Sequence, residues 1–173
     1  MLIESKTIRL RLVEQSDAEF ILCLRMDKKY NQFLSIISSD LQSQKNWIKQ
    51  YKIDEKAEKQ FYFIIENLDG IPFGTVRIYD LKEDSFCWGS WIIKDDAPIF
   101  SAIESMFLIY SYGFNHLGKD SARIDVRNDN IKVIALHKNF GAQVIKIDEV
   151  DTYFILSKER YLENFNKFKK YIN

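Results

Sequence analysis

The chain contains 173 residues, of which 46% are hydrophobic and 29% are charged, as expected of a globular rather than a disordered protein. Lysine and arginine together number 25, and aspartate and glutamate also number 25. There is therefore no excess positive charge for binding a nucleic-acid backbone or an anionic membrane surface. These values argue against nucleic-acid and membrane partners and favour a small-molecule partner.

The cysteines and the apolar stretches bear on where in the cell the protein is expected to be. Cys23 and Cys87 lie far apart and lack metal-ligand spacing, so we expect buried thiols in a reducing compartment and no metal site. Residues 1–12 include several charges and have no signal-peptide core. The most apolar stretch, residues 106–114, is too short to cross a bilayer. We therefore expect one cytoplasmic domain over residues 1–173.

In the N-terminal half, the spacing of apolar residues predicts a strand, two helices and three more strands. Alternation across Thr7–Val13 predicts a half-buried strand, and helices are expected from about Ser16 and after Asp40. A continuous apolar run predicts a strand at residues 61–65, and the reversal signal Asp69-Gly70 predicts that the next strand, at 73–79, returns beside it. A third strand is expected at residues 86–93. Gly89 inside the last of these predicts a bulge or a close backbone approach.

The C-terminal half alternates helices and strands. The expected elements are helices at 102–117 and 130–140 and strands at 123–127, 144–147 and 153–156. In a last helix, Tyr161, Phe165, Phe168 and Ile172 share one face, which we expect to pack on the domain or on a second copy in a homodimer. The order β-α-α-β-β-β-α-β-α-β-β-α predicts the α+β (or α/β) class, with a mixed sheet flanked by helices.

Two segments carry a more specific pattern. Phe86–Ser105 is a strand with a glycine kink, then a loop and a helix start, and Val126–Ala142 is a strand end followed by an Asn-rich helix start and a closing Phe140-Gly141. In this order they resemble the acetyl-CoA-binding core of the GCN5-related N-acetyltransferases (GNATs). The resemblance implies a mostly antiparallel sheet with a splayed strand pair. It also implies metal-free transfer of an acetyl or other short acyl group from acyl-CoA to a primary amine.

The resemblance places the acyl donor on both segments. In the family, the main chain after the kink, here Trp91, Ile92 and Ile93, binds the pantetheine, and one N–H stabilises the oxyanion. The remaining candidates for cofactor binding lie in the loop and at the two helix starts: Lys94, Ala97, Ile99, Phe100, Ser101, Ala102, Asn130 and Lys132. Free N–H groups at a helix start suit a diphosphate.

The phosphate loop departs from the family pattern, which reads basic-x-x-Gly-x-Gly/Ala. Phe100 stands where a glycine normally lets the phosphate approach, and Lys94 is the residue expected to replace the missing charge. Alternatively, Ser101 and Glu104 form a capping box for a core helix that binds no phosphate.

His137 is the candidate catalytic residue, because it shares a helix face with Val133 and Phe140. The family often has a tyrosine there that protonates the CoA thiolate, and an imidazolium with the ordinary pKa of about 6.5 is a competent donor. The alternative is a histidine that is part of the core. No general base is evident, the nearest groups being Arg77, Tyr79, Glu83 and Asp84, and Cys87 is expected to be a buried thiol rather than an acyl carrier.

The acceptor is expected to bind near the first two helices and the neighbouring strands, with Tyr30, Phe33, Arg77, Tyr79 and Trp88 as candidate contacts. The combined motifs look like those of members that acylate amino sugars on nucleotide carriers. Two alternatives stay open: a Rim-type enzyme that acylates protein N-termini, and a non-catalytic module that binds CoA or a partner protein.

Overall fold

The computed structural model describes residues 2–35 and 37–168, and for Phe168 only the backbone. The strands are β1 (Leu2–Glu4), β2 (Ile8–Leu12), β3 (Phe61–Asn67), β4 (Pro72–Tyr79), β5 (Ser85–Ile93), β6 (Ser121–Arg127), β7 (Gln143–Ile147) and β8 (Asp151–Ser157). The helices are α1 (Ala18–Met26), α2 (Lys28–Asn31), α3 (Leu41–Lys56), α4 (Ser101–Ser111), α5 (Ile131–Asn139) and α6 (Lys158–Phe168).

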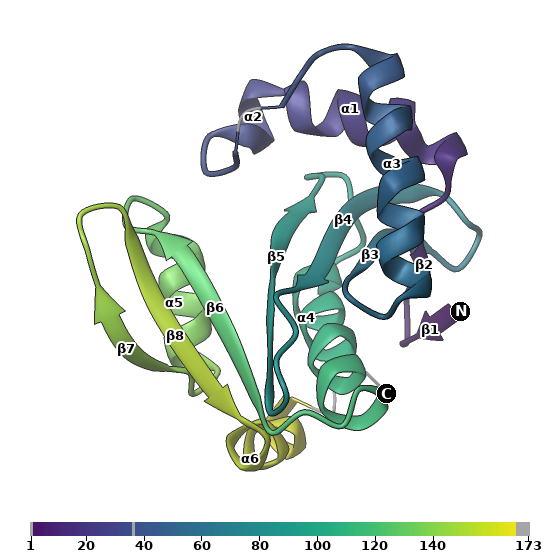
Figure 1. The fold of residues 1–173 in the computed structure, drawn as a ribbon. Helices are drawn as coiled ribbons and strands as arrows, with labels where there is room; N and C mark the ends of the chain where they lie inside the picture. Colours follow the sequence, from purple (N-terminus) through teal and green to yellow (C-terminus); the bar gives the residue numbers. More distant parts are fainter. Residues whose placement is uncertain (1, 36, 169–173) are drawn as a thin grey trace.

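The strands form one sheet in the order β1-β2-β3-β4-β5-β6-β8-β7 (Figure 1). Every pair is antiparallel except β5 with β6, which is parallel. The predicted mixed sheet flanked by helices is therefore confirmed. The strand β1 and the short helix α2 were not predicted, because neither three nor four residues carry a readable periodicity.

Helices cover both faces of the central strands. Tyr62 and Ile64 of β3 pack with Ile21 of α1 and Ile48 of α3. The alternate residues of β3 are Phe61, Phe63 and Ile65, and these pack in a second core with α4. The continuous apolar run therefore predicted a doubly covered strand correctly.

The sheet splits between β5 and β6. The two strands pair only where Ser85–Cys87 meets Ser121–Arg123, and they then diverge (Figure 1). On its other side, β5 has a register shift against β4 between Thr75 and Arg77, and Ser90 takes a positive φ of 49°. The predicted splayed pair is thus present, and the strained residue is Ser90, next to Gly89.

One prediction about a helix end needs correction. The residue that precedes α4 as N-cap is Phe100, so Ser101 and Glu104 do not form a capping box. Glu104 is 1% exposed and instead accepts hydrogen bonds from Thr7 N (2.9 Å), Thr7 Oγ1 (2.7 Å) and Ser5 Oγ. It ties the β1–β2 turn to α4, and this partner lies about a hundred residues away in sequence, where local spacing gives no signal.

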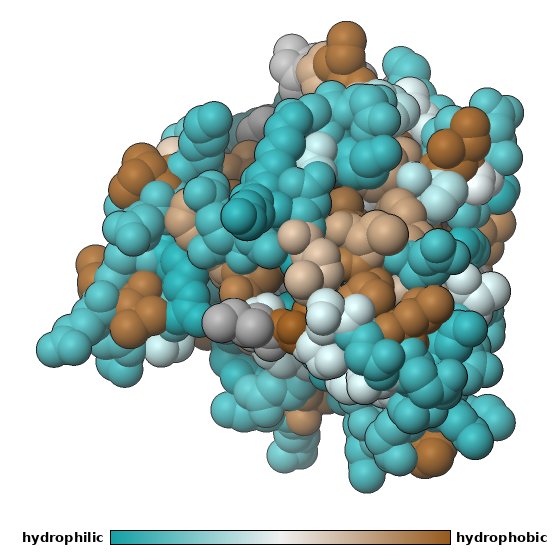
Figure 2. All heavy atoms as spheres, turned by 90° about the horizontal axis from the view of Figure 1, so that it is seen from above, coloured by the Kyte–Doolittle hydropathy of each residue, from teal (hydrophilic) through white to brown (hydrophobic). Residues whose placement is uncertain are grey.

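In the C-terminal helix α6, Tyr161 is buried and Phe165 packs partly buried against the core, so this face packs on its own chain. The side chain of Phe168 and all of Ile172 lie outside the described residues. No helix within residues 2–35 and 37–168 is long and apolar enough to cross a membrane. Figure 2, viewed from the α1–α2 end, shows apolar side chains in separate patches on a mainly hydrophilic surface.

Candidate active site

A cavity of about 270 Å³ lies at the open end of the fork between β5 and β6. Of the predicted residues, it brings together Tyr30, Phe33, Tyr79, Trp88, Trp91, Asn130 and His137. Its roof is α2 with the loop that follows it. This roof is anchored by an ion pair of Lys29 with Asp95 and by a hydrogen bond from Asp95 N to Tyr30 Oη (3.2 Å).

The floor of the cleft is aromatic. The His137 ring lies edge to face with Trp88, with ring centroids 5.4 Å apart, and tilted against Phe154 at 5.7 Å. His137 is 1% exposed, and its Nδ1 has no hydrogen-bond partner among the described residues. Burial lowers the pKa of His137 from 6.5 to about 4.

This low pKa contradicts one assumption behind the choice of His137 as a proton donor. An ordinary histidine has a sizeable imidazolium fraction near neutral pH, and His137 does not. In the folded protein the ring is neutral at pH 7, so it has one N–H and one lone pair to offer. The catalytic role of His137 stays a prediction, and it now applies to the neutral imidazole only.

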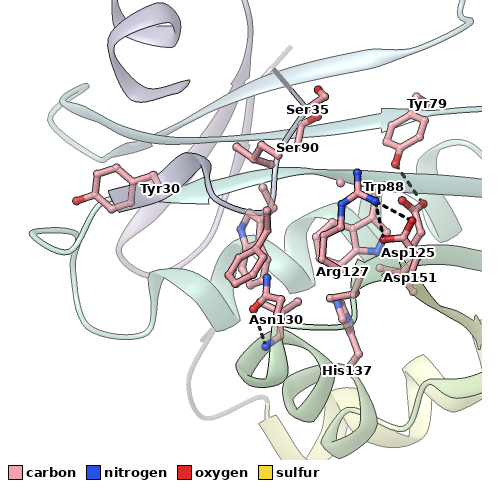
Figure 3. Close-up of a pocket in the computed structure, with 17 residues that line it drawn as sticks. Tyr30, Ser35, Tyr79, Trp88, Ser90, Asp125, Arg127, Asn130, His137 and Asp151 are labelled. Atoms are coloured by element: carbon pink, nitrogen blue, oxygen red, sulfur yellow. Dashed lines mark hydrogen bonds and ion pairs between the residues drawn. The ribbon is translucent and has the colours of Figure 1, made fainter. Parts of the chain in front are cut away.

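One wall of the cleft carries two carboxylates that the sequence analysis missed. Asp125 of β6 and Asp151 of β8 line the cavity, and Asp151 pairs with Arg127 at 3.1 Å (Figure 3). Asp125 Oδ1 lies 3.5 Å from Tyr79 Oη and 3.4 Å from Cys87 Sγ. The signal was present in the alternation of β6, where Asp125 and Arg127 occupy the positions between buried apolar residues.

Cys87 is the buried neutral thiol that was predicted. Burial raises its pKa to about 12, so its nucleophilic thiolate is scarce at neutral pH. Cys23, by contrast, is exposed, and the expectation that both cysteines are buried is wrong. The exposed side of α1 carries it.

Of the residues predicted to bind the acyl donor, only some line the cleft. Trp91 lines the cleft, and its indole N–H donates to Ser105 Oγ of α4 at 3.1 Å. Ile92 and Ile93 pair with β4 and do not line the cavity. Asn130 lines it and also caps α5, accepting from Val133 N at 3.4 Å. Lys132 is exposed outside the cavity.

The loop before α4, residues 94–100, also lies outside the cavity. Phe100 has a φ of 75°, the left-handed conformation that glycine adopts most easily. The backbone thus takes a glycine-like turn at the position where the family has glycine. Ser101 Oγ donates to Pro98 O at 2.7 Å, and Lys94 pairs with Asp96 at 3.3 Å. Ala97, Ile99 and Ala102 complete this predicted set and likewise do not line the cleft.

Arg77 was predicted to contact the acceptor with Tyr79, but it lines a second cavity, of about 320 Å³, between the sheet and helices α1 and α3. No general base was predicted, and of the nearest groups that were named, Asp84 lies outside the cleft. Its carbonyl accepts from Asp120 N at 2.8 Å, at the closed end of the fork, and Glu83 is beside it in the turn. Asp125, which lines the cleft, takes their place as the candidate base.

Comparisons with known proteins agree with this geometry. The sequence model of the acetyltransferase (GNAT) domain matches residues 7–143, and no curated protein matches the chain. Among solved structures, apo FdhC, described as a nucleotide-linked sugar GNAT, is 40% identical with a TM-score of 0.92, over 100% of this chain and 99% of its own.

Two more distant structures share the fold. A variant of spermidine N-acetyltransferase SpeG from Vibrio cholerae has a TM-score of 0.74 at 17% identity, covering 90% of this chain and 96% of its own. A GNAT-family acetyltransferase from Bacillus anthracis has a TM-score of 0.76 at 13% identity, covering 92% and 99%. With a split sheet, a cleft at the fork and a family match over most of its length, the chain belongs to the acetyltransferase (GNAT) family and is an acetyltransferase.

Proposed function

We propose that the protein transfers an acetyl or other short acyl group from acyl-CoA to the primary amine of an amino sugar carried on a nucleotide, within the β5–β6 cleft. The observation that carries the proposal is the carboxylate Asp125 at the opening of the split sheet, where an attacking amine needs a proton acceptor. The likeness to a nucleotide-linked sugar GNAT over the whole chain supports the same acceptor class.

The cleft suits an acyl donor because the split leaves strand edges free. Beyond Cys87, the edge of β5 has no pairing with β6, so its backbone groups can bond an extended amide chain. Acyl-CoA supplies the thioester carbon that the amine attacks. A backbone N–H near Trp91 would stabilise the oxyanion, an interaction worth roughly 2.7–4 kcal/mol in comparable sites.

Proton transfer divides between two residues in this proposal. As the C–N bond forms and the C–S bond breaks, Asp125 accepts the proton that leaves the amine. His137, neutral at pH 7, donates an N–H hydrogen bond to the departing sulfur, and the thiolate takes its proton from solvent. We also place the protein in the cytoplasm, because the exposed thiol of Cys23 suits a reducing compartment.

The test is release of free thiol from acetyl-CoA in the presence of nucleotide-linked amino sugars, free amino sugars, polyamines and peptides. We expect turnover with the nucleotide-linked sugars, and a loss of turnover in Asp125→Asn with acetyl-CoA affinity unchanged. Asp129→Asn, an exposed carboxylate on the turn before α5, is the matched control. Turnover with peptides alone would support a protein N-terminal acetyltransferase. Acetyl-CoA binding without turnover on any amine would support a non-catalytic module.

A further inference from the structure

Two arginines have no acidic partner within residues 2–35 and 37–168, and both line the second cavity. The chain has seven arginines: Arg9, Arg11, Arg25, Arg77, Arg123, Arg127 and Arg160. Five of them pair with a carboxylate, and the exceptions among the described residues are Arg25 and Arg77. Both line the cavity between α1, α3 and the sheet, and no aspartate or glutamate lines it. This cavity of about 320 Å³ is called the arginine cavity below.

Neutral contacts hold the two guanidiniums in place. Arg25 donates from Nη2 to Ser35 O (2.8 Å) and Oγ (2.9 Å), while its Nε is buried and has no partner among the residues that the structure describes. Arg77 donates from Nε to Gln60 Oε1 at 2.8 Å, and its guanidinium lies 5.3 Å from the ring of Trp47. Burial lowers the pKa of Arg77, and the positive charge of Arg25 acts in the same direction.

A further donor is buried in the same cavity. Tyr62 is 2% exposed, and no group among the described residues forms a well-aligned hydrogen bond with its hydroxyl, although Thr75 and Arg25 lie near it and counteract the rise that burial causes in its pKa. A buried hydroxyl and a buried guanidinium nitrogen without partners each cost free energy in the unliganded protein. Two neighbouring cations without a counter-charge add to that cost. An anion in the cavity would satisfy all of these groups together.

We propose that the arginine cavity binds the diphosphate of the acceptor, so that Arg25 and Arg77 select acceptors carried on a nucleotide. The inference rests on the proposed function for the identity of the acceptor. Guanidinium groups match phosphate oxygens with paired N–H donors, and arginine is favoured wherever that geometry matters. Ser35 lines both the arginine cavity and the cleft, so the two cavities are neighbours, and the proposal requires one extended acceptor to occupy both.

The diphosphate of CoA is the other source of the same chemistry, and the fold argues against it. Tyr62 and Arg77 point to the face of the sheet that α1 and α3 cover, whereas Val76 and Ile78 pack in the core with α4. The helix start expected to receive CoA belongs to α4, which covers the opposite face (Figure 1). The two diphosphates would therefore bind on opposite sides of the sheet.

Calorimetric titration with inorganic pyrophosphate, uridine diphosphate and acetyl-CoA tests the site. The variants are Arg25→Gln, Arg77→Gln and Tyr62→Phe, with Arg160→Gln as control, since Arg160 lies on α6 and pairs with Glu163. We expect each arginine variant to weaken pyrophosphate and nucleoside diphosphate binding tenfold or more, and Tyr62→Phe to weaken it by less. Acetyl-CoA affinity should stay unchanged throughout.

Stability provides a readout that separates binding from misfolding. Without added anion, Tyr62→Phe should melt no lower than the parent, because it removes a buried hydroxyl. Arg25→Gln also loses two hydrogen bonds to Ser35, so the melting temperature of each variant without anion is its own baseline for the shift that the anion causes. Pyrophosphate should raise the melting temperature of the parent and of Arg160→Gln, and much less that of Arg25→Gln. Equal stabilisation of the parent and both arginine variants would overturn the proposal. A parallel loss of acetyl-CoA affinity would also overturn it, by assigning the cavity to CoA.

Kinetics distinguish failure of this inference from failure of the proposed function. If nucleotide-linked amino sugars are acylated, Arg25→Gln should raise KM for them and leave kcat nearly unchanged. An unchanged KM would refute the diphosphate site and leave the proposed function standing. If no amino sugar is acylated but pyrophosphate binding still depends on both arginines, the anion site stands and the acceptor assignment fails.

Discussion

The buried, neutral state of His137 predicts a specific dependence of stability on pH. The folded pKa of about 4 lies below the ordinary value of 6.5, so the unfolded chain binds more protons between these values. Stability must then rise with pH through this window and fall as the pH drops from 6.5 towards 4. Protonation of His137 in the unfolded chain should lower the free energy of unfolding by about 2 kcal/mol between pH 7.5 and pH 5. The full loss, reached once the pH is well below the folded pKa, is about 3 kcal/mol.

The perturbation is His137→Phe, which removes the titrating group and keeps a flat ring against Trp88. Urea unfolding of parent and variant at pH 7.5 and pH 5 gives four free energies of unfolding, each by linear extrapolation. All titratable groups other than His137 are the same in both proteins and cancel in the difference of differences. The parent should lose about 2 kcal/mol more than the variant between the two pH values.

A matched control is Ile131→Val, an exposed position on the same helix, which keeps His137 and should lose as much stability as the parent on acidification. The reasoning is refuted if His137→Phe and the parent lose equal free energy on acidification. That outcome would mean that the imidazole is protonated in the fold at pH 5, and it would restore the imidazolium as a proton donor to the thiolate.

Three further predictions concern the cleft and the core. Asp125→Asn should lower kcat/KM in the thiol-release assay by about 10²- to 10⁴-fold, the range for a lost general base, and a fall below threefold would exclude that role. Gly113→Ala should destabilise by about 1–3 kcal/mol in urea unfolding, because the new Cβ would lie 2.1 Å from Phe86; unchanged stability would mean that the π-helical turn Tyr112–His116, which follows α4, shifts freely. Alkylation at pH 8 followed by mass spectrometry should label Cys23 and spare Cys87 until the protein is unfolded, since burial keeps the Cys87 thiol protonated; equal labelling would contradict that burial.

Local patterns predicted the fold well because most elements here are set by nearby residues. The alternation in β2, the apolar run of β3 and the reversal at Asp69-Gly70 each lie within one element or turn, and the structure confirms them. Glu104 shows where prediction from local spacing fails. Its spacing from Ser101 fits a capping box, but a buried carboxylate binds the strongest donors within reach, and these come from Ser5 and Thr7.

The site was predicted less completely because it is assembled from distant segments. His137 was identified from its helix face, but its low pKa depends on Trp88 and Phe154, which lie on strands about twenty to fifty residues away. The lack of a carboxylate near Arg25 is likewise a property of the packed chain. Sequence shows where charges occur, and only the fold shows which of them remain without a partner.

The irregularity in β5 connects the cleft with the arginine cavity. Arg77 is paired with Gly89, directly beside the register shift that brings Ser90 to the fork. A Cβ on Gly89 would lie 3.0 Å from Tyr79 Oη, so the glycine leaves room for the tyrosine that also lies against the Arg77 guanidinium, at 5.4 Å. The distorted part of β5 therefore contributes its free edge to the proposed acyl-donor site, and its paired edge holds Arg77 of the proposed diphosphate site. A substitution at this bulge should disturb both ligands together, whereas Arg25, on α1, can change the acceptor site alone.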